Sequence, residues 1–194
     1  YTTENLTCTN NTVADVDGDG AQNIYNWYIN GSPLALLNMP FDLNNTSTVL
    51  GGAKDYSNYN INGTLGNGVA ASVPTWTTGK LGGAYDFDGS NDYIETEIDA
   101  RLNPTTITVS SWFNAESGGF TAQKPIVHKA FTSHGAPFYQ YSTFLYDKTP
   151  LLKHISFYVT VDNTWYIGAA VANSGWGYGA WHHLVGTYDG ETVK

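Results

Sequence analysis

The chain has 194 residues, among them 21 Gly, 14 Tyr, 8 Phe and 6 Trp, and its Asp and Glu outnumber its Lys and Arg by 17 to 8. The aromatic side chains supply enough apolar area for a packed core, which excludes a disordered acidic tail. The net charge of −9 repels the phosphate backbone of nucleic acids, so we expect no nucleic-acid partner. Because no run of about 18 apolar residues occurs, the sequence predicts no membrane span.

Alternating large and small side chains predict short β-strands along most of the chain, and pairs of Gly, Asn and Asp predict the turns between them. In chain order, the expected strands are 5–9, 23–29, 107–113, 155–161, 165–172 and 181–188. The turn signals are Asn30-Gly31, Asn62-Gly63, Asn67-Gly68, Gly82-Gly83, Asp88-Gly89 and Asp189-Gly190. Only Ala100–Leu102 is expected to form a short helical turn. We therefore predict an all-β fold, an antiparallel sandwich.

The first 35 residues differ in character from the rest of the chain. Cys8 lies on the first expected strand and Trp27 on the next, with an acidic loop between them. This arrangement resembles the B and C strands of an immunoglobulin-like sandwich, as in repeated domains of archaeal and bacterial surface proteins. Cys8 is the only cysteine, so no internal disulfide is expected. A reducing compartment, a buried thiol and a partner outside this chain remain alternatives for it.

An ordered series of motifs follows from residue 36 onward. They are Leu36–Asp42, Lys54–Thr64, Thr75-Trp76, Gly79–Gly89, Asn91–Ile94, Ile107–Asn114 and Trp181–Gly190. The series resembles the laminin G-like, concanavalin A-like jelly-roll domains of prokaryotic surface and secreted proteins. The resemblance implies two curved antiparallel sheets, in agreement with the strand pattern. We expect a partial immunoglobulin-like segment at 1–35 and a jelly-roll domain at 36–194.

The hairpin signal Asp189-Gly190 is followed by only four residues, whereas the family's jelly roll continues with further strands. The domain is therefore expected to be incomplete at its C-terminus. Two explanations stay open, since open sheet edges expose unpaired backbone groups. Either this is a segment of a longer polypeptide, or neighbouring subunits complete the sheet, as in a filament, sheath or surface layer.

Two groups of oxygen-bearing residues are candidate calcium sites, because Ca²⁺ needs several converging oxygen ligands. In the first group, Asp15, Asp17 and Asp19 alternate in a Gly-rich loop, although an EF-hand-like loop would carry Glu or Asp where Asn26 stands. The second group lies in the laminin G-like motifs, where the resemblance implies metal at a loop edge: Asp55, Asn60, Asp86, Asp88 and Asp92. The alternatives are a solvated acidic loop for the first group and turn chemistry for the second.

Aromatic side chains and glycosylation signals point to an extracellular setting. Candidates for stacking on sugar rings are Trp76, Trp165, Trp176 and Tyr178, with core or rim packing as the alternative. Asn-X-Ser/Thr signals stand at Asn5, Asn10, Asn44, Asn45 and Asn62, and a further one at Asn30 is followed by Pro33.

The acidic stretch Glu95–Asp99 is the candidate for catalysis. If it were one strand, Glu95, Glu97 and Asp99 would share a face, which resembles the acidic strand of concanavalin A-like glycoside hydrolases with Glu95 and Asp99 as the pair. The middle residue and the absence of an aromatic cleft depart from that pattern. Adjacent His182 and His183 should point to opposite faces of a strand and so should not share a metal.

The leading functional hypothesis is a non-catalytic extracellular or cell-surface module for adhesion or for recognition of a glycan or protein, stabilised by calcium. The alternative is a structural, homo-oligomeric subunit completed by strands from its neighbours. Glycoside hydrolysis is the weaker alternative, since folds of this type host all three roles.

Overall fold

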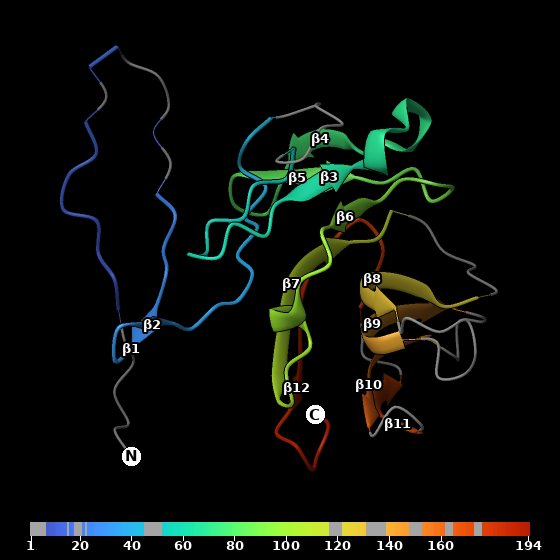
Figure 1. Cartoon of the computed structure of the whole chain (residues 1–194). Helices are drawn as coiled ribbons and strands as arrows, with labels where there is room; N and C mark the ends of the chain where they lie inside the picture. Colours follow the sequence, from blue (N-terminus) through green and yellow to red (C-terminus); the bar gives the residue numbers. More distant parts are fainter. Residues whose placement is uncertain are drawn as a thin grey trace. The chain divides into compact units, whose positions relative to one another are not determined.

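The computed structural model describes residues 7–14, 16–17, 21, 23–44, 52–116, 122–130, 139–147, 153–161, 165–172 and 176–194. Every regular element in this part is a short strand or a single 3-10 turn, and all strand pairs are antiparallel (Figure 1). The all-β, antiparallel prediction is therefore confirmed. None of the described helical elements is long and apolar enough to cross a membrane.

The chain divides into two compact units, Tyr1–Leu102 and Asn103–Lys194. The boundary expected near residue 36 falls inside the first unit. There Asn26 Nδ2 donates to the Tyr56 carbonyl oxygen (2.5 Å), and Asn38 Nδ2 donates to Asn26 Oδ1 (2.8 Å). These bonds join residues on both sides of position 36.

The first unit contains small strand pairs and three 3-10 turns. The strands are β1 (Tyr28–Ile29), β2 (Ser32–Pro33), β3 (Gly63–Leu65), β4 (Thr75–Thr78), β5 (Gly83–Asp86) and β6 (Ile94–Thr96), and the turns are η1 (Gly66–Gly68), η2 (Ala70–Ser72) and η3 (Ala100–Leu102). Strand β1 pairs with β2, β3 with β6, and β4 with β5. A core of Ala53, Leu65 and Tyr85 holds the β3–β6 and β4–β5 pairs together.

The second unit is a two-layer sandwich. Its strands are β7 (Ile107–Asn114), β8 (Lys124–Ala130), β9 (Tyr139–Asp147), β10 (Lys153–Val161), β11 (Trp165–Ala172) and β12 (Trp181–Tyr188). Strand β12 pairs with β7, and the other four form a sheet in the order β11-β10-β9-β8. One buried cluster joins Phe113 and Leu184 to Leu145 and Trp176, so side chains from both sheets form the core.

Turn residues adopt the conformations that their types favour. At the β1–β2 hairpin, Asn30 and Gly31 have φ of 50° and 79°, which is the left-handed conformation that a two-residue turn requires. At the C-terminal hairpin, Tyr188 pairs with Val193 and Asp189 N donates to the Thr192 carbonyl oxygen. The two central residues of this turn are therefore Gly190 and Glu191, one position later than Asp189-Gly190.

The immunoglobulin-like strand pair is short in the described residues. Of the expected strand 5–9, residues 5 and 6 lie outside the described part and residues 7–9 form no strand, while strand 23–29 is reduced to Tyr28–Ile29. A two-stranded ribbon holds few ladder hydrogen bonds and is marginal by itself. Cys8 is a free, exposed thiol, which removes the buried-thiol alternative.

Candidate functional site

The outward face of the β7–β12 pair presents an exposed tryptophan. Successive strand side chains point to opposite faces, so Phe113 is buried in the sandwich while the adjacent Trp112 remains 48% exposed. His183 lies directly opposite Trp112 in the ladder, and the two rings stack with centroids 4.9 Å apart and an interplanar angle of 23°. This pair forms an aromatic stack on the outward face of the sheet.

Polar groups surround this surface. Ser110 Oγ lies 2.8 Å from His183 Nε2, which links the hydroxyl to the imidazole across the two strands. The register puts further side chains on the same face, and none of them is a carboxylate, a lysine or an arginine: Thr108, Asn114, Trp181, Val185 and Thr187. An aromatic ring beside hydroxyl and amide groups is suited to an uncharged ligand that has both C–H and O–H groups.

His182 and His183 point to opposite faces, as expected from their adjacent positions. His183 lies on the outward face, whereas the His182 ring packs against Phe113 with centroids 5.5 Å apart. Nε2 of His182 also lies 3.0 Å from the Gly177 carbonyl oxygen. His182 therefore supports the segment that precedes β12.

The aromatic residues proposed from sequence for sugar stacking occupy other positions. Trp176 is 4% exposed and packs edge-to-face on Phe113 and on Tyr178. Trp76 packs on the core of the first unit, and its Nε1 donates to the Phe41 carbonyl oxygen at 2.9 Å. Trp76 and Trp176 therefore both pack in a core. The side chain of Trp165 lies outside the part of the chain that the structure describes. Trp112 was missed although the alternation of strand 107–113 assigns it to the face opposite Phe113.

Asp55, a candidate calcium ligand, is buried and its carboxylate is fully engaged by the chain itself. Oδ1 accepts from the backbone N of Asn38 (2.9 Å) and of Ser57 (2.8 Å). Oδ2 accepts from Ser57 Oγ (2.6 Å) and from the backbone N of Ile61 (2.9 Å). A carboxylate offers about four lone-pair sites, so these bonds occupy its accepting capacity. Asp55 organises the loop 55–61.

Asp88 and Asp92 are engaged in a turn. Asp88 Oδ1 accepts from the backbone N of Ser90 (2.8 Å), the bond that chiefly lowers the pKa of Asp88, and Asp92 Oδ2 accepts from the backbone N of Asp88 (3.0 Å). This is the turn chemistry that the sequence left as an alternative. Asn60 has a left-handed backbone with φ of 54°, and Asp86 is exposed on β5.

No group of three or more His, Cys, Asp or Glu side chains that could hold a metal ion occurs among the residues that the structure describes. In the loop 15–20, only Val16 and Asp17 belong to that part, and both are exposed. Asp15 and Asp19 lie outside it. Calcium binding by this loop therefore stays a prediction.

A family comparison matches residues 88–194 to the concanavalin A-like lectin/glucanase superfamily. The match spans more than half of the chain and includes both strands of the Trp112 face. The chain belongs to this superfamily. Searches of curated proteins and of solved structures gave no match. The superfamily match, together with the antiparallel sheets, confirms the jelly-roll class and the laminin G-like resemblance.

The superfamily includes glucanases, and the acidic stretch Glu95–Asp99 contains the proposed catalytic pair, Glu95 and Asp99. Strand β6 ends at Thr96, so Glu95, Glu97 and Asp99 do not share one strand. The two glutamates line an open hollow of about 290 Å³ with Thr64, Asn67, Thr96 and Ile98, and Asp99 is not among the lining residues. The hollow therefore lacks the second member of the proposed pair.

Asp99 forms an ion pair with Arg101, whose Nη2 lies 2.5 Å from Asp99 Oδ2. The side-chain hydrogen bond from Arg101, more than the backbone one, lowers the pKa of Asp99 to about 2. A carboxyl group that stays ionised down to this pH is unsuited to donate a proton to a leaving group near neutrality. The Arg101 guanidinium also lies 4.6 Å from the Tyr59 ring centroid, which ties η3 to the loop 55–61.

We predict that the pKa of the Asp99 carboxyl is about 2 in the folded chain and rises toward its ordinary value of 3.8 in Arg101→Gln, where the backbone N of residue 101 still donates to Asp99 Oδ1. Because the folded-state pKa is lowered, the pair stabilises the fold fully above about pH 4, and this contribution disappears as the pH falls through about 2. Carboxyl ¹³C NMR titration measures both values. An Asp99 signal that titrates near 4 in the unaltered chain would contradict the ion pair.

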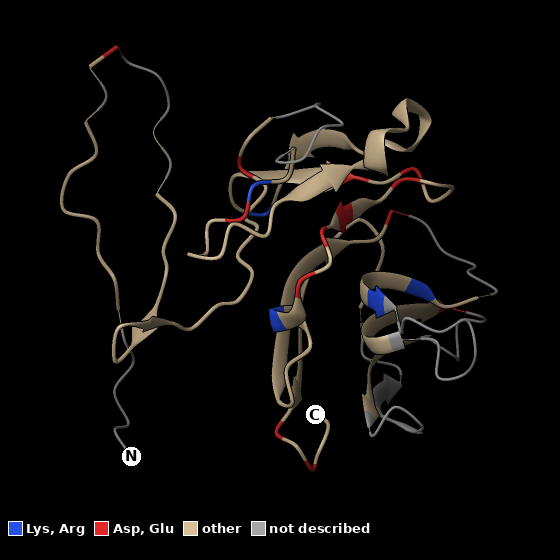
Figure 2. Ribbon diagram, viewed as in Figure 1, with Lys and Arg blue, Asp and Glu red and all other residues tan. Residues whose placement is uncertain are grey.

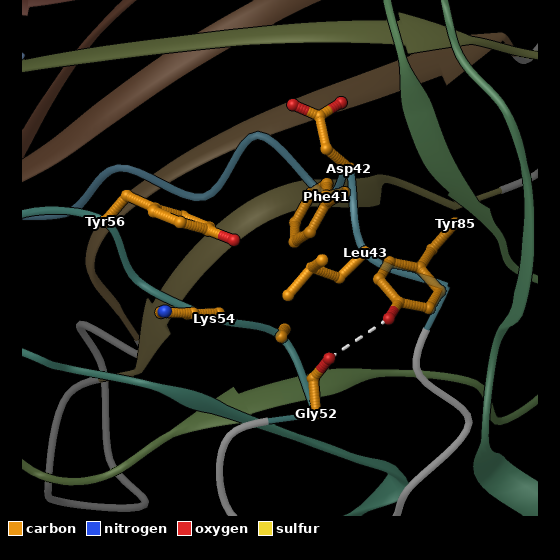
Figure 3. A pocket seen from close by; sticks show the side chains of 8 residues that line it. Phe41, Asp42, Leu43, Gly52, Lys54, Tyr56 and Tyr85 are labelled. Atoms are coloured by element: carbon orange, nitrogen blue, oxygen red, sulfur yellow. Dashed lines mark hydrogen bonds between the residues drawn. The ribbon is translucent and has the colours of Figure 1, made fainter. Parts of the chain in front are cut away.

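The first unit also has a small pocket, which lies outside the residues of the superfamily match. It is lined by Phe41, Asp42, Leu43, Gly52, Ala53, Lys54, Tyr56 and Tyr85 (Figure 3). Its volume is about 10 Å³, enough for about one water molecule and too small for a sugar. Tyr85 donates its hydroxyl proton to the Gly52 carbonyl oxygen at 3.2 Å, the bond drawn in Figure 3. The cavity is a packing feature.

Proposed function

We propose that this chain is a non-catalytic extracellular recognition module that binds neutral glycans on the outward face of β7 and β12. The observation that carries this proposal is the half-exposed Trp112 ring stacked on His183 within the superfamily match. A pyranose has an apolar C–H face that packs on an indole ring, and its hydroxyl groups would bond Ser110 and Asn114 beside that ring. The exposed part of the indole ring and the polar groups beside it supply both kinds of contact.

The proposal specifies neutral sugars because of charge. The chain carries a net charge of −9, which repels uronic and sialic acids, and the outward face offers no lysine or arginine to compensate. An extracellular location agrees with the exposed side chains of Asn10 and Asn44 at two of the glycosylation signals. Asn62, at another signal, is half-buried, and its Oδ1 accepts from the Asp55 backbone N at 2.9 Å.

Glycan-array binding tests this function. We expect saturable binding to neutral glycans, weakened at least about tenfold by Trp112→Ala, because truncating a central tryptophan removes most of a small site's apolar contact. Phe87→Ala is the matched control. Phe87 is also an exposed aromatic residue, but it lies in the first unit and not on β7 or β12, so this variant should bind glycans normally. Binding that survives Trp112→Ala would disprove the assignment to this face.

Other outcomes of the array identify the alternatives. Binding only to immobilised surface proteins, with loss in Trp112→Ala, would keep the site and change the ligand class. An array without any saturable ligand, together with regular fibres or sheets in electron micrographs, would favour the structural subunit. Sugar release by the chain, lost in Glu95→Gln, would be required for a glycoside hydrolase.

Calcium at the loop 15–20 is part of the same proposal. Alternating Asp15, Asp17 and Asp19 supply oxygen ligands, and the glycines at 18 and 20 give the backbone freedom to bring them together. Adding Ca²⁺ in excess of its dissociation constant should then raise the melting temperature by mass action, and Asp17→Asn should reduce that rise. Identical melting curves with Ca²⁺ and with chelator would remove calcium from the proposal.

A further inference from the structure

Large apolar side chains gather on one face of the N-terminal ribbon, residues 23–34. Ile24 and Asn26 are half-buried on one side of the ribbon, and Tyr25, Trp27 and Ile29 are exposed on the other; Tyr28, on the same side as Asn26, is also 47% exposed. Leu34 N donates to the Trp27 carbonyl oxygen (2.7 Å) beyond the β1–β2 pair, which puts Leu34 opposite Trp27. The outer face therefore carries four large apolar side chains: Tyr25 (46% exposed), Trp27 (42%), Ile29 (60%) and Leu34 (62%).

The inner face is held on its own unit by hydrogen bonds. Asn26 bonds the Tyr56 carbonyl oxygen, and the Tyr28 hydroxyl donates to Asn58 Oδ1 at 3.0 Å. These two contacts come from alternate positions of the strand, so they fix which face is turned outward. The apolar side chains are directed away from the loop 56–58 as a consequence of this attachment.

Charge is absent from this part of the chain. No Asp, Glu, Lys or Arg occurs from residue 20 to residue 41, although the whole chain carries a net charge of −9. In Figure 2, the ribbon of β1 and β2 is tan throughout, the colour of residues that are neither acidic nor basic. Two copies of an acidic chain repel each other over most of their surfaces, so a charge-free apolar face is where a second copy can approach at the lowest electrostatic cost.

We propose that the outer face of the N-terminal ribbon is a self-association surface that packs on the same face of a second copy of this chain. Such a contact is self-complementary, so a two-fold axis closes it into a dimer. Four half-exposed side chains supply roughly 400 Å² per chain, about half of what a standard interface buries on each partner. The dimer is therefore weak and forms at high protein concentration.

Sedimentation velocity of the full chain over a hundredfold concentration range tests the proposal. We expect a concentration-dependent dimer that strengthens as NaCl is raised from low to high, because salt screens the repulsion between two acidic chains. Trp27→Ser and Leu34→Ser should each weaken it at least about tenfold. Leu81→Ser, at a more exposed apolar residue of the same unit, is the control and should leave it unchanged.

Circular dichroism and melting curves check that the variants remain folded, which is expected because the substituted side chains are exposed. A chain that is monomeric at every concentration would overturn the proposal. A dimer that tolerates both ribbon substitutions, or that weakens with added salt, would overturn it as well, since the contact would then lie elsewhere or be electrostatic.

Discussion

Asp55→Ala should lower the free energy of unfolding by about 4 kcal/mol. The carboxylate is buried and accepts four hydrogen bonds from Asn38, Ser57 and Ile61. Alanine leaves all four donors inside the first unit without this acceptor, and each unsatisfied buried donor carries a desolvation penalty. Urea denaturation measured on both proteins gives the difference.

Asp86→Ala is the matched control for this experiment. Asp86 is an exposed carboxylate on β5 in the same unit, so its removal should change the free energy of unfolding by less than about 0.5 kcal/mol. Asp55→Asn should fall between the two, because an amide keeps one accepting oxygen and turns an NH₂ group toward donors. Equal stabilities of Asp55→Ala and Asp86→Ala would show that Asp55 does not organise the loop.

Phe157→Ala should destabilise the second unit by about 3–5 kcal/mol. Phe157 on β10 is buried with Tyr141, Val159 and Tyr188, and its ring lies against Gly186 of β12, in the facing sheet. A Cβ atom added at Gly186 would overlap this ring, so Gly186→Ala alone should cost about 1–3 kcal/mol through overpacking.

The double variant separates this contact from general loss of packing. With the Phe157 ring removed, the added methyl group at Gly186 has space, so Gly186→Ala should cost clearly less in the Phe157→Ala background. Chemical denaturation of the four proteins gives the coupling. Strict additivity would mean that the two sheets do not meet at this pair.

Recognition of strands from sequence succeeded where one face is buried and the other is exposed. The expected strand 107–113 corresponds to β7, and 181–188 to β12, because inward and outward side chains alternate there. Strand β9 was not predicted. Its residues 141–145 are all buried, so they show no polar–apolar alternation. Strand β8 was missed as well; it begins Lys124-Pro125 and occupies an edge of its sheet, where proline is tolerated.

The surroundings of the candidate site residues depend on contacts that local sequence does not show. Asp55, Asp88 and Asp92 were selected as oxygen ligands, and hydrogen bonds within the chain engage all three. Composition and spacing reveal which side chains carry oxygen atoms, but they do not reveal which backbone N–H groups reach those atoms. Trp112 was identifiable from alternation, since burial of Phe113 implies exposure of its neighbour.

By itself, the sequence determined the all-β class, the superfamily and the turn at Asn30-Gly31, because these depend on local periodicity, ordered motifs and backbone preference. Only the tertiary structure decided that His183 stacks on Trp112 and that Asn38 donates to Asp55. Such contacts join residues far apart in the chain. Their formation depends on how strands pair and sheets pack, which local sequence leaves open.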